Sequence, residues 1–148
     1  MTTTLIWTNP ELAQSQTNCT YDIPTITRWA AFIEQTIQNE LDANGLPVNP
    51  PLPGKPGYIV GSGSGQLIEV AQQWICRDIR VQQKHDGTIP NDLKEGTMGV
   101  SVTIDTSIKF YDDKGRDALN KYILSQVGDE ENDDSQYAGL LALAGEDL

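Results

Sequence analysis

The segment most able to do chemistry is a glycine-rich turn, Gly61-Ser62-Gly63-Ser64-Gly65, which follows the apolar residues Tyr58-Ile59-Val60. A strand that leads through such a turn into a helix is typical of a dinucleotide-binding loop. That fingerprint needs Gly or Ala where this chain has Gln66, and an acidic residue after a second strand, where this chain has the polar turn Lys84-His85-Asp86. No Gly-Lys-Ser/Thr follows for a phosphate loop. The turn therefore indicates a flexible connection, with a short strand at residues 58–60.

The other reactive side chains form no recognisable catalytic set. His85 is the single histidine, and at the end of a predicted helix it is typical of a dipole partner or surface residue. No Ser or Cys pairs with it from the sequence, so nucleophilic catalysis is not indicated. The acidic stretch 112–117 lacks the oxygen ligands of a calcium loop and predicts a solvated helix face. We expect no enzyme, no catalytic residue, no metal and no cofactor.

Composition limits the class of protein further. The 148 residues suffice for about one domain, and 21 acidic against 10 basic side chains give a net charge of −11. Such a charge disfavours direct binding to nucleic acid or anionic membranes, and favours basic proteins or a channel through which DNA passes. Cys19 and Cys76 lie far apart, and the chain shows neither a secretory leader nor a membrane-spanning run. A reduced, cytosolic context is expected.

Apolar residues recur at helical spacing in three stretches. The first is 26–41, which follows Pro24 and ends before Gly45; the second is 67–79, with Ser64 or Gly65 as cap and an end near Gly87. Each apolar stripe is too narrow to be stable alone, so the helices must bury one another. We predict a mainly α fold, a small bundle of three to four helices with long loops and extended terminal arms. Its predicted core comprises Ile26, Trp29, Ile33, Ile37, Leu67, Ala71, Ile75, Ile79, Leu119, Tyr122 and Ile123.

The stretch after Gly99 fits two structures. Residues 100–110 alternate between apolar and polar, as in a strand, whereas residues 108–123 fit a helix equally well. We divide the stretch into a short β element at 99–104 and a helix from about Thr106 to Val127. Because Gly115 costs a helix about 1 kcal/mol, a break at 112–115 is the main risk to this assignment.

Three segments are expected along the chain. Residues 1–24 form a polar N-terminal arm, either loose or docked, residues 25–127 form the helical domain, and residues 128–148 form an acidic linker with a C-terminal docking segment. Apolar side chains beyond an acidic linker need a surface that receives them. We predict that they bind a partner; the alternative is a helix that folds back on its own bundle. These residues are Tyr137, Leu140, Leu141 and Leu143.

The order of elements resembles the phage head-to-tail connector, or neck adaptor, family. The matching stretches are 33–41 followed by Gly45-Leu46-Pro47, then 67–79, then 111–123 with Ala118-Leu119, so that the resemblance spans about residues 25–127. It implies a structural virion protein, made in the host cytoplasm, that forms a ring of about twelve copies beneath the portal. The implied partners are further copies of the chain, the portal and tail or neck proteins. DNA would pass through the channel without specific binding.

Other classes remain open from the sequence. A tail-completion or capsid-decorating protein would share most of these features. An acidic DNA mimic that inhibits an enzyme would favour carboxylates along whole helix faces, whereas many acids here cluster at 129–134.

Overall fold

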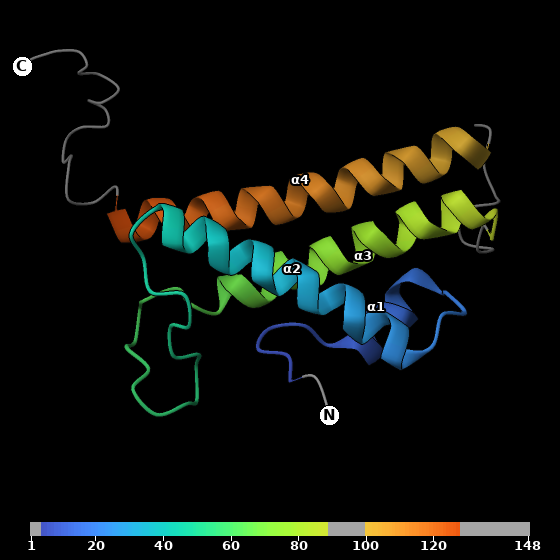
Figure 1. Ribbon diagram of the computed structural model, residues 1–148. Helices are drawn as coiled ribbons and strands as arrows, with labels where there is room; N and C mark the ends of the chain where they lie inside the picture. The colour runs from blue at the N-terminus through green and yellow to red at the C-terminus, as the bar shows by residue number, and fades with distance from the viewer. Residues whose placement is uncertain (1–3, 89–99, 128–148) are drawn as a thin grey trace, which may run out of the picture.

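The protein is a helical bundle arranged around one central helix (Figure 1). The computed structural model describes residues 4–88 and 100–127, and in these ranges it contains four helices and no strand. The helices are α1 (Pro10–Thr17), α2 (Ile23–Ala43), α3 (Gln66–Asp86) and α4 (Val100–Val127). Helix α3 packs against each of the other three. The predicted fold class, a mainly α bundle of three to four helices, is confirmed.

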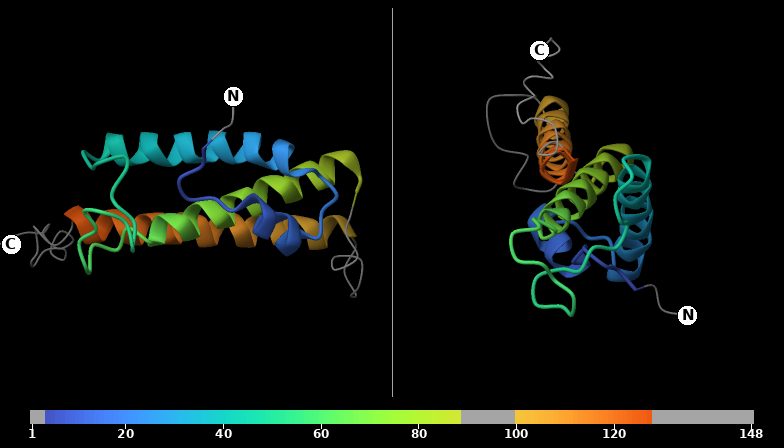
Figure 2. Two further views of the ribbon diagram at one scale, coloured as in Figure 1. Left: turned by 90° about the horizontal axis from the view of Figure 1, so that it is seen from below. Right: turned by 90° about the vertical axis from the view of Figure 1, so that its left-hand side faces the viewer.

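The three long helices run up, down and up. α2 and α4 each run antiparallel to α3, and the end-on view in Figure 2 places them against different sides of it. α1 lies below α3, beside the start of α2. Because α2 and α4 both pack against α3, residues from all three helices come together along the face of α3 that lies between them.

The core follows the predicted apolar stripes closely. All the residues predicted for it are buried except Trp29 and Ile123, which are half-buried and pack against it. Further apolar side chains of the described residues are buried besides those predicted, some in the N-terminal arm and others on or beside the apolar stripes of the helices. These are Trp7, Ala13, Ala30, Leu41, Val70, Trp74, Cys76 and Ile104.

Local signals explain where the helices begin and end. The Asp22 side chain accepts a hydrogen bond from the Thr25 N–H at 3.0 Å, and so caps α2. α3 ends at Gly87, whose φ of 74° is the left-handed conformation that glycine adopts readily. Ser64 does not cap α3, because its hydroxyl instead donates to the Pro51 carbonyl at 2.7 Å. That bond ties the long loop to the start of the helix.

The prediction of a β element at 99–104 is wrong from Val100 onward, because α4 already begins there. Ile104, Ile108 and Tyr111 lie at helical spacing, and the first is buried while the other two are half-buried. A strand would place Phe110 on the same face as Ile104 and Ile108, but Phe110 is exposed. The helix also continues without a break through Gly115.

The predicted strand at residues 58–60 is wrong as well. The loop 44–65 folds through successive turns, in which the Lys55 N–H donates to Leu52 O at 3.0 Å and the Ser62 N–H to Ile59 O at 3.0 Å. Ile59 and Val60 are exposed, because these turns leave no neighbouring strand to cover them within the described residues.

The described part of the N-terminal arm docks on its own bundle through a buried carboxylate. Glu34 of α2 is 4% exposed and accepts hydrogen bonds from the backbone N–H groups of Ile6, Trp7 and Thr8, each at 2.8 Å. The Thr8 hydroxyl donates a fourth bond at 2.8 Å. These donors satisfy the charged group where water cannot reach it.

A second contact fixes the start of α1. The Asn9 N–H donates to Gln72 Oε1 at 3.0 Å, and Gln72 Nε2 donates back to Asn9 O at 3.1 Å. The Asn9 side chain then accepts from the Leu12 N–H, and Pro10 occupies the first turn. α1 is therefore a helix that the sequence analysis did not foresee, held by polar side chains of α2 and α3.

Candidate interaction surface

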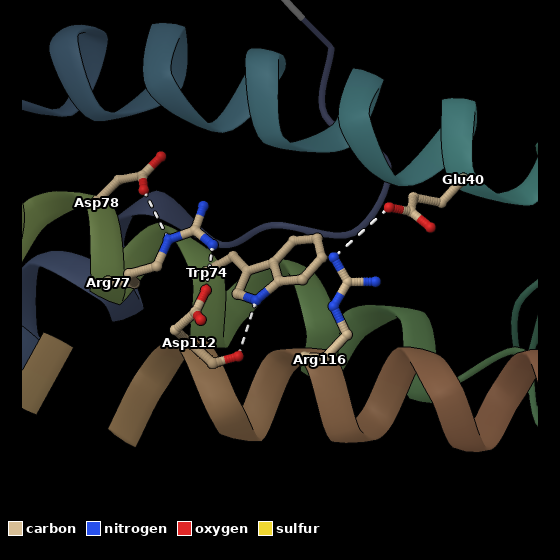
Figure 3. A network of polar contacts seen from close by, with 6 residues as sticks. All are labelled: Glu40, Trp74, Arg77, Asp78, Asp112 and Arg116. Atoms are coloured by element: carbon tan, nitrogen blue, oxygen red, sulfur yellow. Dashed lines mark hydrogen bonds and ion pairs between the residues drawn. The ribbon is translucent and has the colours of Figure 1, made fainter. Parts of the chain in front are cut away.

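A tryptophan between two arginines joins the three long helices (Figure 3). The guanidinium carbons of Arg77 and Arg116 lie 5.1 and 5.2 Å from the ring centre of Trp74. The indole N–H donates to the backbone carbonyl of Asp112 in α4 at 3.2 Å. Both guanidinium groups therefore lie within the roughly 6 Å at which a cation over an aromatic face is attracted to it.

Ion pairs extend this network to both neighbouring helices. Arg77 Nη1 lies 2.7 Å from Asp112 Oδ1 on α4, and its Nε lies 2.9 Å from Asp78 Oδ1. Arg116 of α4 reaches Glu40 of α2 at 3.5 Å. The network therefore links α4 to both α2 and α3 by polar contacts, beside the apolar core that α4 shares with them.

Gly115 allows α4 to approach the Trp74 ring. A Cβ atom at this position would overlap Cδ1 and Nε1 of Trp74, closer than real Cβ contacts come. Glycine at this position is unfavourable for helix formation, but it lets the backbone of α4 lie close to the Trp74 ring of α3.

We expect Gly115→Ala to destabilise the protein by about 1–3 kcal/mol net, because overpacking outweighs the gain in helix propensity of about 1 kcal/mol. Denaturant unfolding measures the change. In a Trp74→Leu background the same substitution should be neutral or stabilising, because the ring is gone. An equal loss in both backgrounds would show that the contact with Trp74 is not the cause.

An open groove lies between α2 and α3 beside this network. We call it the aromatic groove, and it has a volume of about 210 Å³. Phe32 is 75% exposed and Val81 47%, while burial raises the pKa of the Asp78 carboxyl above its usual value, although Arg77 opposes the shift. An apolar groove with one carboxylate is suited to an apolar group that carries a positive charge. Its lining residues are Trp29, Phe32, Asp78, Val81 and Gln82.

A second exposed aromatic group lies on α4. Phe110 is 54% exposed, packs edge-on against Tyr111 with ring centres 5.6 Å apart, and has the Lys114 ammonium 5.7 Å from its ring centre. Phe110 lies two residues from Asp112, and so about 200° around the helix from the side that faces Arg77. We call Phe110 and Lys114 the Phe110 flank. It points away from the aromatic groove.

The predicted site residues have different outcomes. Tyr137, Leu140, Leu141 and Leu143 lie outside the described residues, so their partner-binding role stays a prediction. His85 is exposed at the end of α3, where its Nδ1 lies 3.1 Å from Asp86 Oδ1.

Neither Cys76 nor the acidic stretch 112–117 has the surroundings of a reactive or metal-binding site. Burial raises the pKa of the Cys76 thiol to about 12, so this thiol is not a nucleophile at neutral pH. The acidic stretch 112–117 lies within α4, where Lys109 Nζ lies 2.6 Å from Asp113 Oδ2. Among residues 4–88 and 100–127, no group of three or more His, Cys, Asp or Glu side chains could hold a metal ion.

Sequence reasoning missed the aromatic groove and the Phe110 flank. Phe32 and Phe110 are off the apolar stripes of their helices, and a large apolar residue outside its stripe is the signal that could have identified them.

Comparison of the chain with protein-family models, curated proteins and solved structures found no match in any of the three. None of the described helices is both long and apolar enough to cross a membrane.

Proposed function

We propose that this protein is a structural virion protein, a head-to-tail connector whose copies form a ring beneath the portal and join the capsid to the tail. The observation that carries the proposal is the presence of two exposed aromatic surfaces on different sides of a folded bundle, the aromatic groove and the Phe110 flank. A subunit of a ring needs two different surfaces, because each copy contacts one neighbour on each side. The order of helices and the proline-containing loop after α2 agree with the connector resemblance.

The acidic composition has a physical role in such a ring. About twelve copies at a net charge of −11 each would carry on the order of a hundred negative charges around the channel. This charge would repel the DNA backbone, so the genome would slide through the ring without binding.

The described carboxylates argue against a DNA mimic. Asp78, Asp112 and Asp113 form ion pairs with Arg or Lys side chains. Asp105, Asp117 and Glu40 are also paired. A mimic of the DNA backbone needs regularly spaced carboxylates that are free for a basic groove, and these six are already partnered.

The ring is tested by electron microscopy of the purified chain, alone and with the portal of the same virion. Class averages with rotational symmetry, coaxial with the portal, are expected. A tail-completion protein would instead attach to tail structures, and a capsid-decorating protein to the shell. A chain that binds neither itself nor the portal would overturn the proposal.

We further expect the C-terminal segment to attach the subunit to its assembly. Deletion of residues 129–148 should leave the melting temperature of the isolated domain nearly unchanged, because the described core lies within residues 4–127. Attachment should be lost, since each buried apolar side chain of that segment contributes about 1.5–3 kcal/mol. Calorimetry and co-sedimentation with portal complexes measure the two effects. Normal attachment of the truncated chain, or a large drop in its melting temperature, would contradict the docking role.

A further inference from the structure

We infer that neighbouring copies pair head to tail, with the Phe110 flank of one copy in the aromatic groove of the next. This inference rests on the proposed function and names the two surfaces that build its ring. The occupant of the groove is a second copy of this chain.

The two surfaces match in chemistry. The groove offers Trp29, Phe32 and Val81 around a volume of about 210 Å³, and Phe110 presents a single exposed ring. An aromatic side chain that enters a pocket of other aromatic side chains gains from area burial and from edge-to-face contacts. Phe110 is exposed on a helix that is already folded, so association costs little additional conformational entropy of the backbone.

The charges also match. Asp78 lines the groove, and its carboxylate can accept further bonds beyond the one from Arg77. Lys114 lies four residues after Phe110, on the same side of α4, and no described carboxylate lies within 4.0 Å of its ammonium group. Insertion of Phe110 would therefore bring Lys114 toward Asp78 of the neighbour.

The positions of the two surfaces along the bundle favour a closed ring. The Arg77–Asp112 ion pair marks one level on α3 and α4. Asp78 is adjacent to Arg77, and Phe110 lies two residues before Asp112, about 3 Å along the helix axis. Both surfaces thus lie at nearly the same level but face different directions. A contact that repeats by rotation with little translation closes into a ring, whereas a large translation would give an open filament.

The test mixes two variants. Phe32→Asp destroys the groove but keeps the flank, and Phe110→Asp destroys the flank but keeps the groove. Each variant alone should be monomeric in sedimentation velocity at protein concentrations up to about 1 mM, whereas the wild-type chain forms higher oligomers. The equimolar mixture should form dimers and nothing larger, because only one intact pair of surfaces remains.

Two controls keep folding apart from assembly. Circular dichroism and thermal melting of both variants should match those of the wild type at concentrations low enough to keep the wild type monomeric, since both side chains are exposed. Leu124→Asp replaces another exposed apolar residue of α4, 14 residues beyond Phe110 and so about 21 Å along the axis. This variant should assemble as the wild type does.

A double-mutant cycle tests the charge pair. Asp78→Asn and Lys114→Gln should each weaken self-association about five- to tenfold, and the double variant should be no weaker than either single one. Additive losses would show that these two residues do not meet across the interface.

The remaining outcomes separate the interface from the proposed function. Rings that persist in Phe32→Asp would overturn this interface and leave the connector proposal standing. Dimers formed by one variant alone would indicate a two-fold contact and would overturn the head-to-tail arrangement. Self-association that disappears on deletion of residues 129–148 would identify the C-terminal segment as the occupant. A wild-type chain that stays monomeric at about 1 mM would also overturn the inference, while binding to the portal would still support a connector.

Discussion

Ile75→Asp should unfold the protein at room temperature. Ile75 is fully buried on α3, the helix that packs against all three others. The substitution removes a large apolar side chain from the core, at a cost of about 2–5 kcal/mol, and places a carboxylate there without a partner, at a cost of several kcal/mol more. A domain of this size is stable by about 5–15 kcal/mol, so most or all of its stability would be lost.

The control for this prediction lies on the same helix. Ile68 is 42% exposed, so Ile68→Asp makes the same chemical change where water can solvate the carboxylate. Thermal melting followed by circular dichroism should show a cooperative transition for Ile68→Asp and none for Ile75→Asp. A cooperative melt of Ile75→Asp near the wild-type temperature would show that this core assignment is wrong.

The sequence predicts the long helices well because their apolar stripes are regular. Ile26, Ile33 and Ile37 on α2, and Leu67, Ala71 and Ile75 on α3, follow one another at intervals of four or seven residues, and all six are buried. Such stripes depend only on local periodicity and on the need to bury apolar area.

The errors occur where a tertiary contact decides the structure. Alternation at 100–110 fits a strand as well as a helix, and the choice depends on tertiary contacts: α4 packs against α3, and Ile104 is fully buried. Gly115 favours a helix break by propensity alone, but it lies against Trp74, a contact between residues 41 positions apart. Neither neighbour can be deduced from the local sequence.

The candidate interaction surfaces have only a weak signal in the sequence, for a related reason. Phe32 and Phe110 attract no notice as single apolar residues, since isolated exposed apolar side chains are common. They become informative only in the folded protein, where Phe32 lines a groove with Val81, and where Phe110 lies on the side of α4 opposite to the Asp112 side chain that binds Arg77. The C-terminal segment has a stronger signal in the sequence, because its apolar side chains follow an acidic run.

The N-terminal arm illustrates the same limit with a polar contact. Its composition indicates a segment that cannot form a core alone, and leaves open whether it is docked. Docking depends on Glu34, which occupies a position between Ile33 and Gln35 that the periodic pattern does not mark. Its carboxylate is buried only because the arm supplies four donors to it.

Glu34→Ala should release the arm and cost about 3–5 kcal/mol, the second-largest effect expected for a single substitution. The carboxylate accepts three backbone N–H bonds and one hydroxyl bond, and bonds to a charged acceptor contribute about 1.5–3 kcal/mol each. The sum is not additive, because the released N–H groups of Ile6, Trp7 and Thr8 can bind water once the arm leaves. Trp7 would then lose its burial as well.

Hydrogen exchange distinguishes this release from general destabilisation. The amide hydrogens of Ile6, Trp7 and Thr8 should exchange orders of magnitude faster in Glu34→Ala than in the wild type. The exchange rates of amides in the middle of α3 should change only as much as the global free energy of unfolding changes. Glu40→Ala is the matched control, because Glu40 lies on the same helix and loses only the partly exposed pair with Arg116 at 3.5 Å. That control should change stability by less than about 1 kcal/mol and leave the arm protected. Protected arm amides in Glu34→Ala would mean that apolar packing of Trp7 holds the arm without the carboxylate.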